Sequence, residues 1–126
     1  MLKLKPFEDE KGSLIPIEFK DVPFEVKRLF LIKNVPRYSI RGKHAHFKTK
    51  QLLICLKGHI EIFTHDGKTL SNNIIKENET FFIDRLIWDY QQFLTNDCEM
   101  LVLCSTNYIL EDYITNFEQF LKIKNI

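Results

Sequence analysis

Short runs of alternating or continuously apolar residues fill the chain from Gly12 to Ile75, and turn residues separate them. No apolar repeat with the helical spacing of three to four residues lasts longer than one turn in this part of the chain. Alternation with a period of two, and short continuous apolar runs, are both typical of β-strands. The pattern predicts strands over 13–18, 26–32, 51–56, 59–64, 69–75, 80–83, 87–93 and 99–104. Asp66-Gly67 predicts a two-residue hairpin turn, since both residues tolerate the positive φ that this turn requires.

The period of the pattern changes near the C-terminus. Apolar residues recur there at spacings of three and four, as on one face of a helix; they are Tyr113, Ile114, Phe117, Phe120 and Leu121. A helix is therefore predicted to begin near residues 110–111. Together these elements favour a single all-β domain over 1–126. We expect a cupin-like jelly roll or small barrel of about eight to eleven short strands with a C-terminal α-helix, whose mouth can hold a small ligand.

Composition narrows the classes of function. A formal charge of +1 argues against a basic nucleic-acid-binding surface. No run approaches the roughly 18 apolar residues of a membrane span, and charges interrupt the apolar residues of the N-terminus, unlike those of a signal peptide. We therefore expect a cytoplasmic protein whose partners include neither nucleic acid nor membrane. The three cysteines, Cys55, Cys98 and Cys104, lie in apolar runs without CxxC spacing and are predicted to be buried, reduced thiols.

The segment RGKHAHFKTKQ, residues 41–51, carries the clearest chemistry in the sequence. It places His44 and His46 two residues apart, so that in an extended segment both imidazoles project from one face. Imidazole takes up and releases protons near neutral pH. The spacing therefore indicates an acid/base pair, with the alternative that one histidine binds a loop carbonyl while the other is exposed.

The surroundings of the two histidines argue against a metal site. A zinc or iron site needs three or four ligands, but Gln51 stands where a carboxylate ligand is expected and no histidine follows His65. Nearby cations would repel a divalent metal ion and attract a diphosphate; they are Arg41, Lys43, Lys48 and Lys50. We therefore predict no metal ion at this segment.

RGKHAHFKTKQ also resembles RGxHAHxxxxQ, the hallmark segment of the dTDP-sugar 3,4-ketoisomerases, a family of WxcM-like cupins. The resemblance covers nearly the whole chain, through QLLICLKG, Trp88 and the tail segments LVL and DYI. It implies an isomerase that moves the ketone of dTDP-4-keto-6-deoxy-D-glucose from C4 to C3 through an enediol intermediate, giving a dTDP-3-keto-6-deoxyhexose for deoxyamino-sugar biosynthesis. It also implies a homodimer that needs neither a metal ion nor another cofactor, in which an N-terminal strand is exchanged between subunits.

The resemblance assigns roles to individual residues. His46 is expected to be the principal proton shuttle, while His44 positions or polarises the sugar oxygens and can supply the second proton. The residues expected to contact the substrate are Arg41, Arg28, Gln51, Tyr38, Lys48, Trp88 and Tyr90. Five of them also have a purely structural alternative: a surface ion pair for Arg41 and Arg28, a satisfied polar residue of the barrel for Gln51, solvation for Lys48 and core packing for Trp88.

The chain departs from its relatives at two places. Many relatives carry a tyrosine near the positions of Phe30 and Leu31, and after Trp88 they show His or Arg and then Glu, where this chain has DYQ. Tyr38 and Tyr90 are the candidates to replace the missing hydroxyl. Two other functions remain open, a nucleotide-sugar-binding cupin subunit without catalytic activity and a 3,5-epimerase acting on the same class of substrate.

Overall fold

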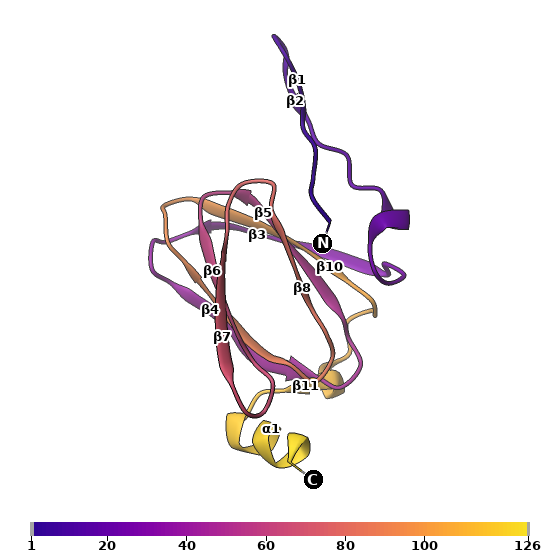
Figure 1. The fold of residues 1–126 in the computed structure, drawn as a ribbon, viewed down its shortest axis with the longest axis vertical. Coiled ribbons are helices and arrows are strands. Elements are labelled where there is room, and N and C mark those ends of the chain that lie inside the picture. Colours follow the sequence, from indigo (N-terminus) through magenta and orange to yellow (C-terminus); the bar gives the residue numbers. More distant parts are fainter. Residues whose placement is uncertain (1, 126) are drawn as a thin grey trace.

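The computed structural model describes residues 2–125, so the two terminal residues of the predicted domain lie outside the described range. Two facing β-sheets and a C-terminal helix make up the body of the molecule (Figure 1). In chain order the elements are β1 (Phe7–Asp9), β2 (Gly12–Leu14), the 3-10 turn η1 (Phe19–Asp21), β3 (Arg28–Val35), β4 (Ile40–His46), β5 (Gln51–Lys57), β6 (Ile60–His65), β7 (Leu70–Ile75), β8 (Thr80–Ile83), β9 (Trp88–Phe93), β10 (Cys98–Cys104), the 3-10 turn η2 (Leu110–Asp112), β11 (Tyr113–Ile114) and α1 (Phe117–Lys124).

One sheet has the strand order β3-β10-β5-β8 and the other β11-β4-β9-β6-β7, with antiparallel pairing throughout. The prediction of an all-β, cupin-like fold with a C-terminal helix is confirmed. Among residues 2–125 the two sheets are not hydrogen-bonded into a closed barrel, so the fold is a sandwich of the jelly-roll kind. The ligand-sized space of such a fold lies between its sheets.

The seven strands predicted between residues 26 and 104 are present, with ends shifted by at most three residues. The hairpin predicted at Asp66-Gly67 joins β6 and β7, but its loop spans 66–69, because His65 and Leu70 form the last pair of the ladder. The side chain of Asp66 accepts hydrogen bonds from the backbone N–H groups of Lys68 and Thr69, both at 2.8 Å. These two bonds stabilise the longer turn.

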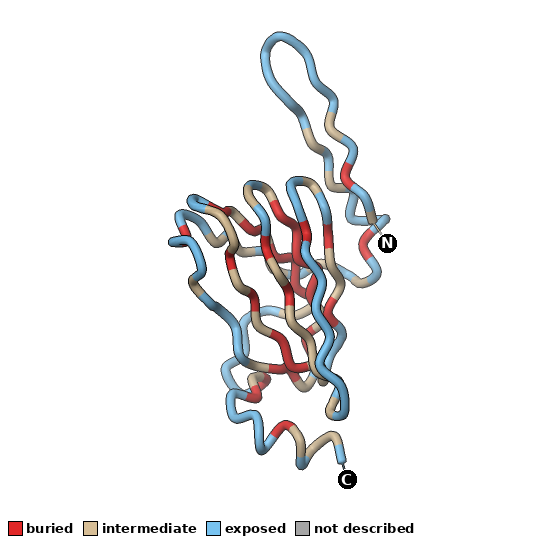
Figure 2. Tube along the Cα trace, turned by 60° about the vertical axis from the view of Figure 1, so that its left-hand side comes forward, coloured by how far each residue is buried: buried red, intermediate tan, exposed pale blue. Residues whose placement is uncertain are grey.

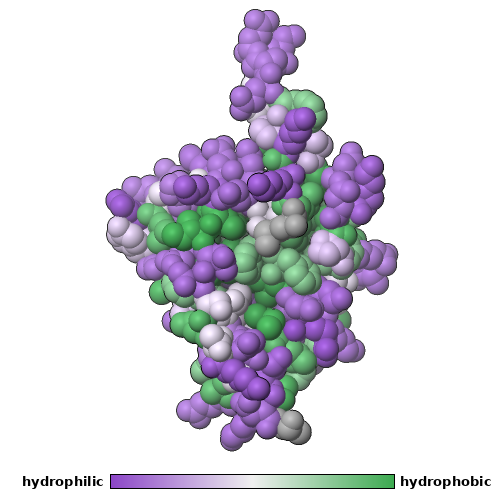
Figure 3. Space-filling model, viewed as in Figure 1, coloured by the Kyte–Doolittle hydropathy of each residue, from purple (hydrophilic) through white to green (hydrophobic). Residues whose placement is uncertain are grey.

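The strand predicted over 13–18 is wrong beyond Leu14. β1 and β2 form a hairpin that extends away from the two sheets (Figure 1), with exposed residues along both strands (Figure 2) and a hydrophilic tip (Figure 3). Pro16 lacks the N–H group that a continuing ladder requires. Ile15 and Ile17 instead pack on the outer face of the β5 sheet, against a cluster that contains Leu52 and Ile54.

The helix predicted to begin near residues 110–111 begins at Phe117. The side chain of Asn116 caps it by accepting a hydrogen bond from the Gln119 backbone N–H at 2.8 Å. Tyr113 and Ile114, which the periodicity assigned to the helix, form β11 and pair with His46 and Ala45 of β4. Backbone pairing with the edge of the sheet therefore outweighs a helical repeat that extends only one turn further.

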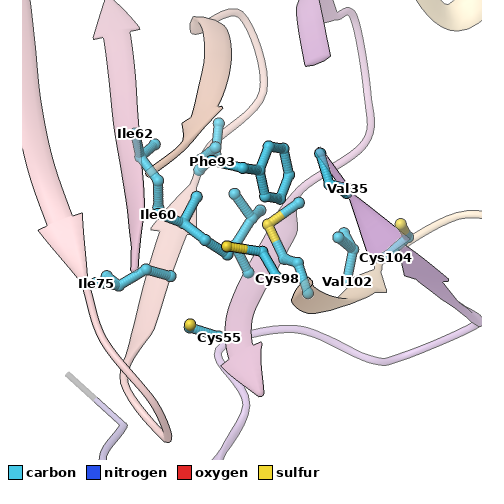
Figure 4. Packing of buried hydrophobic residues seen from close by; sticks show 12 residues of the cluster. Val35, Cys55, Ile60, Ile62, Ile75, Phe93, Cys98, Val102 and Cys104 are labelled. Atoms are coloured by element: carbon cyan, nitrogen blue, oxygen red, sulfur yellow. The ribbon is translucent and has the colours of Figure 1, made fainter. Parts of the chain in front are cut away.

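The inner faces of the two sheets form the main core (Figure 4), which includes Phe93 at 0% exposure together with Ile60 and Ile62. All three cysteines are buried and free, as predicted. Leu53, Met100 and Val102 belong to this core and also form part of the wall of a cavity between the sheets. No helix within residues 2–125 is long and apolar enough to cross a membrane.

Candidate active site

A cavity of about 180 Å³ lies between the two sheets. Its apolar wall comes mainly from β3, β5 and β10 and its polar wall mainly from β4 and β9; the lining residues are Phe30, Ile32, Arg41, Gly42, His44, Gln51, Leu53, Asp89, Gln91, Met100 and Val102. An apolar surface with a few convergent polar groups is typical of small-molecule sites, and sites for drug-sized ligands occupy roughly 300–1,000 Å³. The smaller cavity of this protein therefore suits a group of about the size of one sugar ring.

A β-bulge in β4 shapes the polar wall. The pairing of β4 with β9 shifts register between Gly42 and His44, and Gly42 and Lys43 have φ values of +96° and +67°. In a regular strand, residues 41 and 44 would face opposite sides, but one extra residue at a bulge changes that alternation. Arg41 and His44 consequently both line the cavity. A Cβ atom on Gly42 would lie 3.0 Å from the Cα atom of Tyr90, so the bulge requires glycine at this position.

The two histidines of RGKHAHFKTKQ lie on one face of β4, as the spacing predicted. The ring centroids of His44 and His46 are 4.9 Å apart in an edge-to-face arrangement. His44 lines the cavity, and His46, 3% exposed, lies next to it toward β11. The ring of Tyr113 packs against both, with centroid distances of 5.3 Å to His44 and 4.5 Å to His46. These three rings form a contiguous cluster at one end of the cavity.

Burial holds both imidazoles in their neutral form. Desolvation lowers the pKa of His44, and it lowers the pKa of His46 to about 4, an effect that the charges of His44 and Arg28 reinforce and that of Asp112 opposes. The Nε2 atom of His46 is buried and has no hydrogen-bond partner among residues 2–125. At neutral pH the pair is therefore uncharged and available to accept a proton.

Arg28 and Gln51, both predicted site residues, lie at the same end of the sandwich. The guanidinium of Arg28 lies over the rings of Phe30 and Tyr108, at 5.7 and 5.6 Å from their centroids. Its Nε atom is buried without a hydrogen-bond partner in the described part of the chain. Gln51 is buried in the cavity wall, where its Nε2 atom donates to the Sγ atom of Cys104 at 3.6 Å. The structure therefore brings these two residues and Arg41 together with the histidines.

Tyr38 and Lys48 do not line the cavity. Tyr38, 57% exposed, lies in the loop between β3 and β4, and the guanidinium of Arg37 lies over its ring at 4.8 Å. Lys48 is exposed in a separate groove next to Arg85, and its backbone N–H donates to Asp112 Oδ1 at 2.7 Å. The structure therefore corrects the expectation that Tyr38 supplies a hydroxyl group beside the histidines.

Trp88 and Tyr90 share one face of β9, as predicted, but it is the outer face of the sheet. They line a second groove together with Phe117 of α1, and the rings of Trp88 and Phe117 lie 5.2 Å apart. The expectation that both residues line the histidine cavity is thus corrected, and Trp88 belongs to the core beneath α1. The alternate residues Asp89 and Gln91 face the cavity instead.

Sequence reasoning missed Asp89 and Tyr113 as site residues. Asp89 is 1% exposed, its Oδ1 atom accepts a hydrogen bond from Gln91 Nε2 at 2.6 Å, and burial raises its pKa to about 7. The alternation along β9 held the signal for Asp89, because an outward Trp88 implies an inward residue 89. Tyr113 was hidden by its assignment to the helix. Within residues 2–125, no group of three or more His, Cys, Asp or Glu side chains is placed to hold a metal ion.

Comparisons with known proteins find a matching family model and similar proteins. The family model described as FdtA, WxcM-like, C-terminal, matches residues 1–125. The chain is 32% identical over 124 residues to the TDP-4-oxo-6-deoxy-alpha-D-glucose-3,4-oxoisomerase of Aneurinibacillus thermoaerophilus, a match that covers 97% of this chain and 89% of that protein.

Solved structures extend the similarity to three dimensions. A 3,4-ketoisomerase from Helicobacter canadensis is 32% identical with a TM-score of 0.91, covering 99% of this chain and 96% of its own. A 3,4-ketoisomerase from Thermoanaerobacterium thermosaccharolyticum, solved as a histidine-to-asparagine mutant in complex with TDP-4-keto-6-deoxyglucose, is 32% identical with a TM-score of 0.90, covering 98% of this chain and 91% of its own. The chain therefore belongs to the FdtA, WxcM-like family.

Proposed function

We propose that this protein is a sugar-nucleotide 3,4-ketoisomerase that moves the ketone of dTDP-4-keto-6-deoxy-D-glucose from C4 to C3. The observation that carries the proposal is the pair of buried, neutral imidazoles of His44 and His46 at a cavity of the size of a sugar ring. A relative of similar sequence and fold was solved with TDP-4-keto-6-deoxyglucose bound. That complex supports the choice of substrate.

The reaction begins with loss of the proton on C3, which the neighbouring C4 ketone acidifies. We assign this step to His46, whose neutral Nε2 atom has no hydrogen-bond partner in the described chain and can accept the proton. The resulting negative charge on the enediolate stabilises the imidazolium that forms beside it. Return of the proton to C4 then gives the 3-keto sugar.

His44 and Tyr113 position the reacting sugar in this account. His44 lines the cavity and orients the sugar oxygens or supplies the second proton. The ring of Tyr113 packs against both imidazoles and brings a phenol close to them. We propose that Tyr113 replaces the tyrosine that relatives carry near the positions of Phe30 and Leu31.

The nucleotide lies outside the cavity, because about 180 Å³ is too small for more than the sugar. Arg41 is exposed at the cavity and Arg28 lies near its histidine end. A planar guanidinium grips a phosphate with two parallel hydrogen bonds. We assign the diphosphate to these two arginines.

The active form is proposed to be a homodimer that uses the β1–β2 hairpin. Phe7 and Leu14 are register partners in the hairpin and are 57% and 64% exposed. Leu29 and Leu31 on the outer face of β3 are also exposed, at 55% and 46%. Apolar side chains of this size on a projecting hairpin and on a sheet face indicate a surface that a second copy covers.

Turnover and binding measured side by side test the function. The native protein is expected to convert dTDP-4-keto-6-deoxy-D-glucose, while His46→Asn is expected to lose about 10²-fold to 10⁴-fold in kcat and to keep its affinity for dTDP in calorimetry. Binding without turnover by the native protein would instead identify a non-catalytic binding subunit. Solvent deuterium entering at C5 would instead identify a 3,5-epimerase.

A further inference from the structure

A buried carboxyl group lies in the cavity wall beside the imidazole pair. Asp89 of β9 lines the cavity and pairs in register with His44 of β4. Residues directly opposite each other in an antiparallel pair have Cβ atoms about 4.5–5.5 Å apart. The carboxyl group and the imidazole of His44 therefore face the same small space.

One oxygen of the Asp89 carboxyl group accepts a hydrogen bond, and the other has no partner in the described part of the chain. Gln91 Nε2 donates to Asp89 Oδ1 at 2.6 Å, while Asp89 Oδ2 is buried without a hydrogen-bond partner among the residues that the structure describes. A buried polar atom without a partner is costly, so native structures usually pair it with protein, water or ligand. Because Asp89 lines a cavity, a ligand in that cavity is a candidate partner for Oδ2.

The surroundings keep about half of this carboxyl group protonated at pH 7. Burial raises its pKa to about 7, and the hydrogen bond from Gln91 opposes that rise. The charged or titratable residues that line the cavity with it are Arg41 and His44, both from β4. The linings from β3, β5 and β10 are uncharged, namely Phe30, Ile32, Gln51, Leu53, Met100 and Val102. A carboxylic acid in such a place both donates and accepts protons at working pH.

We infer that Asp89 is a further catalytic residue, which carries a proton between the O3 and O4 oxygens of the sugar while the histidine pair moves the carbon-bound proton. The inference rests on the proposed ketoisomerase function. Moving a ketone from C4 to C3 requires one C–H and one O–H bond to break and one of each to form. If one imidazole nitrogen moves the proton from C3 to C4, another group has to move the proton between O3 and O4.

The two half-reactions balance with these groups alone. In the first, the histidine takes the C3 proton, the C–H electron pair forms the C3–C4 double bond, and O4 takes the proton of Asp89 Oδ2, which gives the enediol. In the second, Asp89 Oδ2 takes the O3 proton, the C3–O3 double bond forms, and C4 takes the proton from the imidazolium. Both residues return to their starting states, and no oxidant or reductant is consumed.

Asp89→Asn is the variant that separates this role from packing. Asparagine has nearly the same shape and can still accept the hydrogen bond from Gln91, but its amide cannot release and regain a proton. Asp84→Asn is the matched control, because Asp84 is exposed and its Oδ1 atom accepts a local hydrogen bond from the Arg85 backbone N–H. The measurements are kcat and KM for dTDP-4-keto-6-deoxy-D-glucose from pH 5 to 9, and the affinity for dTDP.

The expected result is a loss of about 10²-fold to 10⁴-fold in kcat for Asp89→Asn, with dTDP affinity within about threefold of native. The decline in native activity above about pH 7, where Asp89 loses its proton, is expected to disappear in this variant. Asp89→Ala, assayed with and without added formate, provides a second test, since formate in the vacated space restores a group that can carry the proton.

The possible outcomes test the proton relay through Asp89 and the proposed ketoisomerase function separately. A kcat within threefold of native for Asp89→Asn would overturn the relay, as would an unchanged alkaline decline or the absence of formate rescue in Asp89→Ala. If the native protein and Asp84→Asn both leave the substrate unchanged, the proposed function itself fails, and the relay fails with it. Conversion by the native protein but not by Asp89→Asn, together with formate rescue, supports both.

Discussion

At the scale of single residues, burial disfavours the charged forms of two side chains at the cavity, His46 and Asp89. The pKa of His46 falls to about 4 and that of Asp89 rises to about 7. Both shifts oppose the charged form, but they affect stability with opposite dependence on pH. In the native protein the effects of His46 and Asp89 on the free energy of unfolding partly cancel as pH changes. Variants that remove one group at a time separate the two effects.

His46 should destabilise the protein in mild acid. As pH falls through 6.5, the unfolded chain takes up a proton on this residue, whereas the folded protein does so only near pH 4. The native free energy of unfolding is therefore expected to fall further between pH 7 and pH 4 than that of His46→Asn, by at most about 3 kcal/mol. Urea unfolding at a series of pH values measures this, and parallel profiles for the two proteins would contradict the account.

Asp89 should have the reverse effect. Its pKa is 3.8 in the unfolded chain and about 7 in the folded protein, so native stability declines as pH rises from about 4 to 7. We expect Asp89→Asn to be more stable than the native protein at pH 8, by up to about 4 kcal/mol, with no such gain at pH 4. A melting-temperature comparison at both pH values tests this. Equal or lower stability of the variant at pH 8 is the contrary result.

At the scale of elements, the bulge in β4 is the feature that assembles the polar wall. Gly42→Ala places a Cβ atom 3.0 Å from the Cα atom of Tyr90 at a φ of +96°, so either the bulge or β9 has to move. We expect a loss of about 1–3 kcal/mol in stability and a larger loss of kcat/KM than the stability change explains. Gly12→Ala is the control for the stability measurement, because Gly12 also has positive φ but nothing lies within 4 Å of the added atom. A native kcat/KM in Gly42→Ala would contradict this role for the bulge.

Local pattern predicted most of the elements but not the face that each presents to the site. The alternation along β9 correctly put Trp88 and Tyr90 on one side, yet only the packing of α1 against Trp88 makes that side the outer one. Likewise, the spacing of His44 and His46 predicted their shared face, while the bulge that adds Arg41 to it depends on pairing with β9. Long-range contacts settle what a period of two leaves ambiguous.

The elements that were misassigned lie where two local preferences compete. Tyr113 and Ile114 continue the apolar repeat of α1, but the edge of β4 offers them backbone partners. Residues 13–18 alternate like a strand, but Pro16 stops the ladder after Leu14 and the segment turns back onto the outer face of the β5 sheet. At such positions the local sequence is compatible with both structures, and contacts with distant parts of the chain determine which one forms.

At the scale of the whole molecule, the projecting hairpin predicts a dimer. Changing Phe7 and Leu14 to serine together should weaken the association of two subunits without unfolding either, since both side chains are exposed in the single subunit. Sedimentation velocity over a range of concentrations measures the change. Leu70→Ser is the control. Leu70 is also an exposed leucine, but it lies on β7, in the sheet that does not contain β3, so this variant should leave the dimer intact. A native protein that sediments as a monomer would contradict the prediction.

The fold, the cavity and the imidazole pair together support the proposal that the protein transfers protons between neighbouring carbons of a nucleotide-linked keto sugar. Proton NMR of dTDP-4-keto-6-deoxy-D-glucose with the native protein in deuterated buffer tests this proposal, with His46→Asn measured alongside. The native protein is expected to give a 3-keto product that has lost the C3 proton of the substrate, and His46→Asn is expected to give none. A substrate that keeps its C3 proton with the native protein, while its signals broaden on binding, would contradict the proposal and leave a protein that holds the sugar nucleotide without converting it.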